Sequence, residues 1–222
     1  KALHETGLTR LHIGLETGSD AVLKLMDKGV TAEEQISGGR RVVESGIQLS
    51  EYYLVGLGGR GLWRENAVET ARVLSAINPD YIRLRTLSVH PGLPMHEGIV
   101  DGSYELLDDE EMIDELRLMI DGLDCQSNFV SDHINNLLQE VEGKLPEDKS
   151  RMLAVIDRFK GLPDDERANY RIGRRARIYA SLDELGDEHK HEVVERIVGE
   201  LRRGNHDGDP ARIERLMEGY FV

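Results

Sequence analysis

The sequence predicts an α/β fold in which parallel strands and helices alternate, followed by a helical extension. Three observations lead to this prediction. Strand-like and helix-like segments alternate through residues 1–130, the strands carry one apolar and one polar face, and residues 131–222 repeat a helical apolar pattern. Strands that recur every few tens of residues with a helix between them are typical of parallel sheets. With 222 residues, the chain can hold one large domain or a medium one with an appendage.

The elements of the first half follow from apolar periodicity and from start and stop signals. Strands are expected over residues 10–15, 48–55 and 81–87, with a weaker one over 125–130. Helices are expected after Ser19, from Thr31 to Ser45, and over 64–77 and 108–121. Ser19 has the properties of an N-cap, and Thr31 with Glu34 forms a capping-box pattern.

Two of these strands are two-faced, because side chains alternate across a strand. The apolar faces hold Leu11, Ile13, Leu15, Ile82 and Leu84, and the polar faces hold Arg10, His12, Gly14, Glu16, Arg83 and Arg85. A flat sheet covered by helices on both sides would be apolar on both faces, so a curved barrel with a polar interior fits better. The polar residues could then contact a substrate, or the two arginines could simply pair with carboxylates such as Glu16 and Glu51.

The second half is expected to be a separate helical domain over residues 131–222, after a first domain over residues 1–130. Its apolar residues form three stripes at helical spacing, one of which begins at Ile134. Ser131 is a good N-cap for that first helix, which makes capping the simplest role for Asp132 and His133. The segment 204–210 has the composition of a surface loop before a last short helix.

Three features occur where the predicted strands end, the edge at which parallel α/β folds bind ligands. They are Glu16-Thr17-Gly18, the glycine-rich segment 56–59 and the segment 90–94, His-Pro-Gly-Leu-Pro. Glycines let a backbone approach a ligand closely, and a strand-end carboxylate can bind both hydroxyls of a ribose.

These three segments resemble radical S-adenosylmethionine (SAM) enzymes. "IGLETGSDAVLKLMDKGVTAEE" is similar to their fourth strand and the helix after it, "YYLVGLGG" to their fifth strand, and "YIRLRTLSVHPGLPMHE" to their sixth. The likeness is to the group of tRNA methylthiotransferases, oxygen-independent coproporphyrinogen oxidases and the Elongator catalytic subunit, and it covers residues 8–100. It implies a partial (β/α)₆ TIM-like barrel.

The resemblance also implies a SAM site. Glu16, beside Thr17, would meet the ribose, and Lys28 would meet the SAM carboxylate. The backbone around Gly56, Gly58 and Gly59 and around His90, Pro91 and Gly92 would line the adenine. Glu51 is a weaker candidate, because the polar residue of its strand aligns with either Glu51 or Tyr52. His12, Arg83 and Arg85 are candidate substrate contacts.

The family's Cys-x₃-Cys-x₂-Cys loop is absent, and Cys125 is the single cysteine of the chain. Three thiolates hold the [4Fe–4S] cluster of these enzymes, so no residue of this chain is expected to bind that metal cluster. The chain is therefore expected to be the C-terminal part of such an enzyme and inactive alone. Its first partner would be its own N-terminal segment, with which it would generate a 5′-deoxyadenosyl radical that modifies a substrate.

Composition limits the remaining partners. The net charge is −14, and residues 101–222 carry 30 acidic against 17 basic side chains. DNA binding is therefore not expected, while a small molecule or a locally bound RNA stays open as substrate. No apolar run could cross a membrane, and a single cysteine fits the cytoplasm. Two alternatives remain: a metal-dependent barrel hydrolase or aldolase using Glu16, His90 and His133, and a non-catalytic barrel that binds a protein partner.

Overall fold

The computed structural model describes residues 2–204, and the predicted loop over 204–210 with its short helix lies almost wholly outside them. The chain forms two compact units, one of residues 1–136 with 141–153 and one of 137–140 with 154–222. The domain boundary expected after residue 130 thus falls within the stretch assigned to the first unit. In the described residues, no helix is both long and apolar enough to cross a membrane.

The first unit is built on a five-stranded sheet with the order β1-β2-β3-β4-β5. The strands are β1 (Arg10–Glu16), β2 (Gln48–Val55), β3 (Tyr81–Thr86), β4 (Asn128–Val130) and β5 (Gly143–Lys144). The first four are parallel, and β5 is antiparallel to β4. The weak strand expected near residue 130 is thus present as β4, and β1 forms one edge of the sheet.

Helices connect these strands. They are α1 (Ala2–Glu5), α2 (Asp20–Leu25), α3 (Ala32–Glu44), α4 (Gly59–Ile77), α5 (Pro94–Asp101) and α6 (Asp109–Gly122). The N-cap at Ser19 and the capping box at Thr31 are confirmed, since each hydroxyl accepts from the backbone N–H three residues further on. Helix α4 begins at Gly59 rather than near residue 64, and α5 lies where the sequence indicated only a loop.

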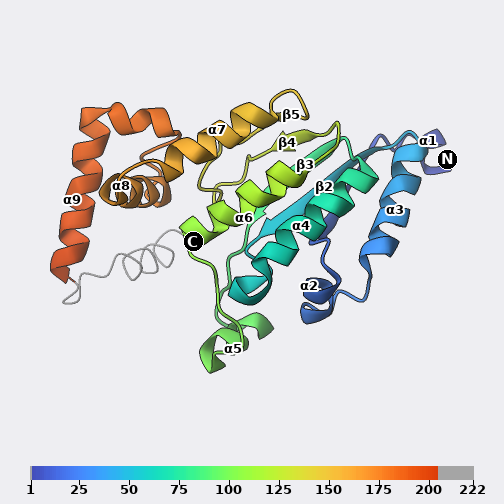
Figure 1. Cartoon of the computed structure of the whole chain (residues 1–222), viewed down its shortest axis with the longest axis horizontal. Helices are drawn as coiled ribbons and strands as arrows, with labels where there is room; N and C mark the ends of the chain where they lie inside the picture. Colours follow the sequence, from blue (N-terminus) through green and yellow to red (C-terminus); the bar gives the residue numbers. More distant parts are fainter. Residues whose placement is uncertain (1, 205–222) are drawn as a thin grey trace. The chain divides into compact units, whose positions relative to one another are not determined.

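One face of the sheet is covered by α3, α4 and α6, which lie side by side along it (Figure 1). Alternate residues of β2 and β3 point into this layer and are buried: Leu49, Tyr53, Val55, Ile82 and Leu84. The opposite face carries the polar residues, as the alternation predicted. Ile13 departs from that pattern, because it is 37% exposed on the edge strand instead of being buried against helices.

Residues 131–142 contain no helix, so the predicted helix through Ile134 is wrong. Ile134 is 52% exposed, whereas Leu137, Leu138 and Val141 are buried from a series of turns. The apolar residues of this segment have helical spacing, but an irregular backbone directs their side chains into a core. The capping role expected for Asp132 is therefore wrong as well.

The second unit is helical, as expected. It contains α8 (Asp164–Arg175), the 3₁₀ helix η1 (Leu182–Gly186) and α9 (Glu188–Gly204), and α7 (Lys149–Lys160) leads into it from the first unit. Three aromatic rings lie at the centre of its core. The ring centroid of Tyr170 lies 5.9 Å from the centroids of both Phe159 and Tyr179. Gly173 lies under Tyr179, where a Cβ atom would come within 2.2 Å of the ring.

Candidate functional site

Glu16 lies at the carboxyl end of β1, where the strand is irregular. Ile13 pairs with Glu51 and Glu16 pairs with Tyr53, so β1 holds one extra residue between them. Such a bulge re-aims the side chains that follow it. Glu16 itself has a φ of 63°, a left-handed backbone that is uncommon for a residue with a side chain. The bulge, and not simple alternation, therefore sets the direction of this carboxylate.

The Glu16 carboxylate is bound by Lys28, and Gly14 leaves space beside it. Lys28 Nζ donates to Glu16 Oε2 at 2.7 Å, and the two side chains are 29% and 34% exposed. Gly14 leaves room for the other oxygen, because a Cβ at Gly14 would come within 3.0 Å of Glu16 Oε1. Glu16 and Lys28, which are 12 residues apart in the segment that resembles the fourth strand, are thus brought together.

Thr17 and Gly18 anchor the strand end instead of facing a ligand. The Thr17 side chain is fully buried, and its hydroxyl accepts from the Ser19 N–H at 3.0 Å. The Gly18 N–H donates to the Thr70 hydroxyl of α4 at 2.8 Å, and a Cβ at Gly18 would lie 2.6 Å from the Glu69 carbonyl oxygen. The turn after Glu16 is therefore fixed directly against α4.

The glycine-rich segment after β2 is held by a buried carboxyl. Glu115 of α6 accepts from the Tyr53 hydroxyl at 2.6 Å, from Asn66 Nδ2 at 2.7 Å and from the Gly56 N–H at 3.1 Å. Burial raises the pKa of Glu115 to about 7, although these three hydrogen bonds lower it in part. The acidic residue that organises this loop thus comes from a distant helix, and no sequence signal pointed to it.

The remaining groups of this segment are covered by Tyr104. Its hydroxyl donates to the carbonyls of Gly56 and Leu57, each at 3.0 Å, and its ring would meet a Cβ at Gly59 at 3.1 Å. The Gly59 N–H donates to the Gly56 carbonyl. Gly58 is the N-cap of α4, and a Cβ there would lie 2.9 Å from the Leu62 backbone. Packing accounts for these glycines, and Gly56, Gly58 and Gly59 are all buried.

The segment after β3 is more open. His90, Pro91 and Gly92 are exposed, and Gly92 has a φ of 94°. The Leu93 N–H donates to the His90 carbonyl, which closes a turn ahead of α5. This turn follows the strand next to β2, so the exposed backbone of residues 90–92 lies on the same carboxyl edge of the sheet as Glu16.

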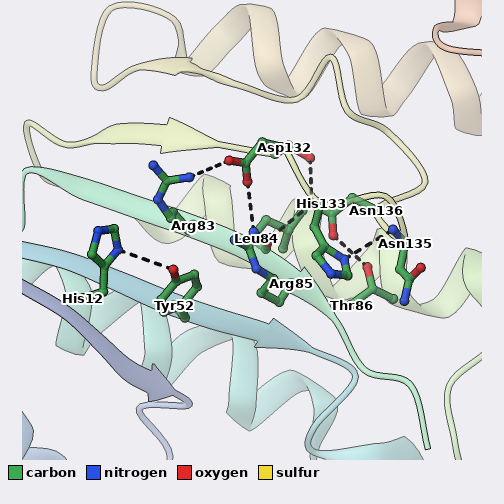
Figure 2. Close-up of polar contacts among 11 residues, drawn as sticks. His12, Tyr52, Arg83, Leu84, Arg85, Thr86, Asp132, His133, Asn135 and Asn136 are labelled. Atoms are coloured by element: carbon green, nitrogen blue, oxygen red, sulfur yellow. Dashed lines mark hydrogen bonds and ion pairs between the residues drawn. The ribbon is translucent and has the colours of Figure 1, made fainter.

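The polar sheet face brings Arg83 and Arg85 together with Asp132 (Figure 2). Arg83 Nη1 donates to Asp132 Oδ2 at 2.5 Å, and Arg85 Nη1 donates to Asp132 Oδ1 at 3.0 Å. Partial burial raises the pKa of Asp132, but hydrogen bonds and charge from Arg85 and Arg83 outweigh it, so this pKa lies below its usual value. The carboxylate that pairs with the arginines is thus Asp132, not Glu16 or Glu51.

Two aromatic side chains continue this cluster towards β1. The Arg85 guanidinium lies 4.8 Å from the centre of the Tyr52 ring, a cation–π distance. The Tyr52 hydroxyl lies 3.4 Å from His12 Nδ1, and Figure 2 shows the pair on neighbouring strands. His12, Arg83 and Arg85, all predicted to face one interior, therefore do share one face of the sheet.

Glu51 lies on the opposite face. Its side chain is 2% exposed, and Oε2 has no hydrogen-bond partner among the described residues. Burial raises the pKa of Glu51 to about 7, partly opposed by a backbone hydrogen bond from Leu15. Tyr52, the alternative in the alignment, is the residue of β2 that stands among the polar side chains.

The described residues do not form a metal site. Within residues 2–204, no three His, Cys, Asp or Glu side chains converge in a way that could hold an ion, so Glu16, His90 and His133 do not form the metal site of the alternative reading. Burial and the charge of Arg85 lower the pKa of His133. Cys125 is a buried free thiol.

Comparisons with known proteins show a likeness at the level of structure. No protein-family model matches the chain, and no curated protein does. Among solved structures, the archaeal Methanocaldococcus infernus Elp3 with an N-terminal deletion (1–46) superposes with a TM-score of 0.52 at 18% identity. The match covers 72% of this chain and 38% of that one, so this chain spans well under half the length of that protein. The predicted fold class is confirmed: the chain has the α/β partial-barrel fold of the matching part of Elp3, with a helical extension.

Proposed function

We propose that this chain is the C-terminal part of a radical SAM enzyme and contributes one side of its SAM site. The observation that carries the proposal is the Glu16–Lys28 pair, 2.7 Å apart at the carboxyl end of β1, in a sheet with the Elp3 fold. Ligands of parallel α/β folds bind at this edge.

The residues of this edge suit the groups of SAM. A carboxylate accepts from both hydroxyls of a ribose, and Glu16 offers Oε1 for this role while Oε2 is bound to Lys28. Lys28 is a cation for the methionine carboxylate. Gly14 keeps the space beside Glu16 free of side chain. The exposed backbone of residues 90–92 is the better support for adenine, because the segment 56–59 is buried and hydrogen-bonded within the protein.

SAM, when bound and reduced by a [4Fe–4S] cluster, supplies a carbon radical that abstracts hydrogen from a substrate. The described residues do not fit the cluster, since their single thiol, Cys125, is buried and three thiolates are needed. The part of the reaction assigned to this chain is therefore limited to binding and orienting SAM and substrate. The chain alone is expected to produce no 5′-deoxyadenosine.

The edge of the sheet offers a place for the segment that would carry the cluster. Strand β1 ends the strand order, and Ile13 on it is 37% exposed. A parallel edge strand presents free N–H and C=O groups that another strand can pair with. We therefore propose a preceding segment of the same enzyme as the first partner, working in the cytoplasm on a small-molecule substrate.

Calorimetric titration of SAM into the chain tests the proposal. The chain is expected to bind SAM, and Glu16→Gln is expected to weaken binding by at least about tenfold, because a neutral amide holds ribose hydroxyls and Lys28 less well. Glu33→Gln is the matched control, since Glu33 makes the same type of exposed pair on α3. Absence of binding by the folded chain, or equal binding by Glu16→Gln, would contradict the proposal.

A further inference from the structure

The arginine pair on the polar face is held by one carboxylate. Asp132 gives one oxygen to Arg83 and the other to Arg85, at 2.5 and 3.0 Å. Within residues 2–204, no second carboxylate forms an ion pair with either guanidinium. Two positive charges therefore share one negative charge, and the cluster keeps a net positive charge in a chain whose total is −14.

The two arginines are oriented before any ligand arrives. Both project from β3, and their side chains are 19% and 25% exposed. Arg85 is fixed further by the Tyr52 ring and by donation from Nη1 to the Leu84 carbonyl at 2.7 Å. Arg83 Nε is buried and has no partner among the described residues. A buried donor without a partner costs stability, which indicates that the cluster is not optimised for stability alone.

Asp132 is attached differently from the arginines. Its side chain is 48% exposed, and it lies in the irregular segment 131–142 instead of on a strand. Exposed ion pairs add little to stability. Its two oxygens, one on each guanidinium, occupy the position that the carboxylate of a ligand would take between two forked donors.

We propose that Arg83 and Arg85 bind the carboxylate of a small organic substrate, and that Asp132 holds their place until that substrate displaces it. Arg85 pairs with Leu54, one residue beyond the partner of Glu16 on the same strand, so the site lies two strands from Glu16, roughly 10 Å at ordinary strand spacing. The binding of a carboxylate by the two arginines does not depend on the proposed function. That this carboxylate belongs to the substrate of the enzyme does rest on the proposed function.

The observations favour a small carboxylate over other anions. The net charge of −14 disfavours binding of a polynucleotide. A carboxylate already spans the two arginines at hydrogen-bond distances, so the spacing of the two guanidiniums suits a two-oxygen group. The Tyr52 ring and Leu54 give the rest of a small ligand an apolar surface next to this charge.

The test uses the whole chain and sodium succinate as probe, at ionic strength held constant with sodium chloride. Binding is followed by the ¹⁵N–¹H signals of the arginine Nε–H groups. Saturable binding is expected for succinate and not for the neutral succinamide. Asp132→Asn is expected to tighten it about tenfold, because the internal competitor loses its charge. Arg85→Gln is expected to abolish saturation, while Arg10→Gln, on the same face but paired with Gln48 and Tyr81, leaves it unchanged.

The outcomes separate the two proposals. The inference is overturned if Asp132→Asn binds succinate no more tightly than the unaltered chain, if Arg10→Gln weakens binding as much as Arg85→Gln, or if inorganic phosphate binds as tightly as succinate. A gain of affinity in Asp132→Asn cannot come from misfolding. Succinate binding without SAM binding refutes only the proposed function, and SAM binding that Glu16→Gln weakens, without succinate binding, refutes only this inference.

Discussion

Replacing Glu51 by Gln is expected to stabilise the first unit, and to do so more at pH 8 than at pH 5. Burial raises the pKa of Glu51 from its ordinary value of 4.5 to about 7. A raised carboxyl pKa means that the folded state binds the proton more tightly than the unfolded state. Its contribution to stability is therefore fully present below about pH 4.5 and is lost as the pH rises through about 7.

The size of the effect follows from the shift. The raised pKa corresponds to a loss of about 3 kcal/mol of folding free energy once the carboxyl is fully ionised. At pH 5 the loss is less than about 1 kcal/mol. Gln has nearly the same shape and no charge to desolvate. Its advantage over Glu51 should therefore grow by about 2–3 kcal/mol between pH 5 and pH 8.

Urea unfolding followed by Trp63 fluorescence measures this difference, since Trp63 is the single tryptophan and belongs to the first unit. The raised pKa of Glu115 is present in both proteins and cancels. Glu33→Gln, at a 77% exposed side chain, is expected to show no such trend. If Glu51→Gln gains the same free energy at pH 5 and pH 8, Glu51 does not titrate as its burial requires, and the reasoning fails.

Three further predictions concern glycines. In α3, Gly38→Ala is expected to raise the free energy of unfolding in urea by up to about 1 kcal/mol, because nothing lies within 4 Å of a Cβ there and Ala is the better helix former. Its neighbour Gly39→Ala should lower it by about 1–3 kcal/mol, since a Cβ would press on Ile77 at 2.7 Å, and a stabilised Gly39→Ala would contradict this packing. In the second unit, Gly173→Ala is expected to abolish the aromatic core, measured as loss of the near-UV circular dichroism of its tyrosines, because its Cβ would overlap the Tyr179 ring. An unchanged tyrosine signal would show that the ring has room to move.

The strand and helix pattern of residues 1–130 could be predicted because periodicity and capping agreed there. Ser19 and Thr31 cap as expected, and the two faces of β3 separate apolar from polar residues. The segment 131–142 could not be predicted, since its apolar spacing matches a helix and only tertiary contacts decide otherwise. Asn136 illustrates this: its amide donates to the Leu84 carbonyl at 3.1 Å, a contact between residues 52 positions apart.

The candidate site was predicted in part for the same reason. Arg83 and Arg85 could be assigned to one polar face, because alternation within a regular strand is local information. Their partner Asp132 lies 47 residues beyond Arg85, in a segment without regular structure, and nothing in its neighbourhood distinguished it from a helix cap. The resemblance could not decide between Glu51 and Tyr52, because a shift of one residue in the alignment moves a side chain to the other face of the sheet.

Glu16 shows where alternation itself fails, and its backbone allows a sharp test of whether this carboxylate serves the fold or a ligand. A left-handed backbone with a φ of 63° destabilises the fold by about 1 kcal/mol at a residue with a side chain. The ion pair with Lys28 stabilises it by at most about 1 kcal/mol. Glu16→Gly removes both the backbone strain and the ion pair, so the free energy of unfolding should change by less than about 1 kcal/mol. Affinity for SAM should nevertheless fall at least tenfold in the titration described above. A loss of more than about 2 kcal/mol in urea unfolding, with SAM affinity retained, would mean that the carboxylate holds the strand end together and that the site lies elsewhere.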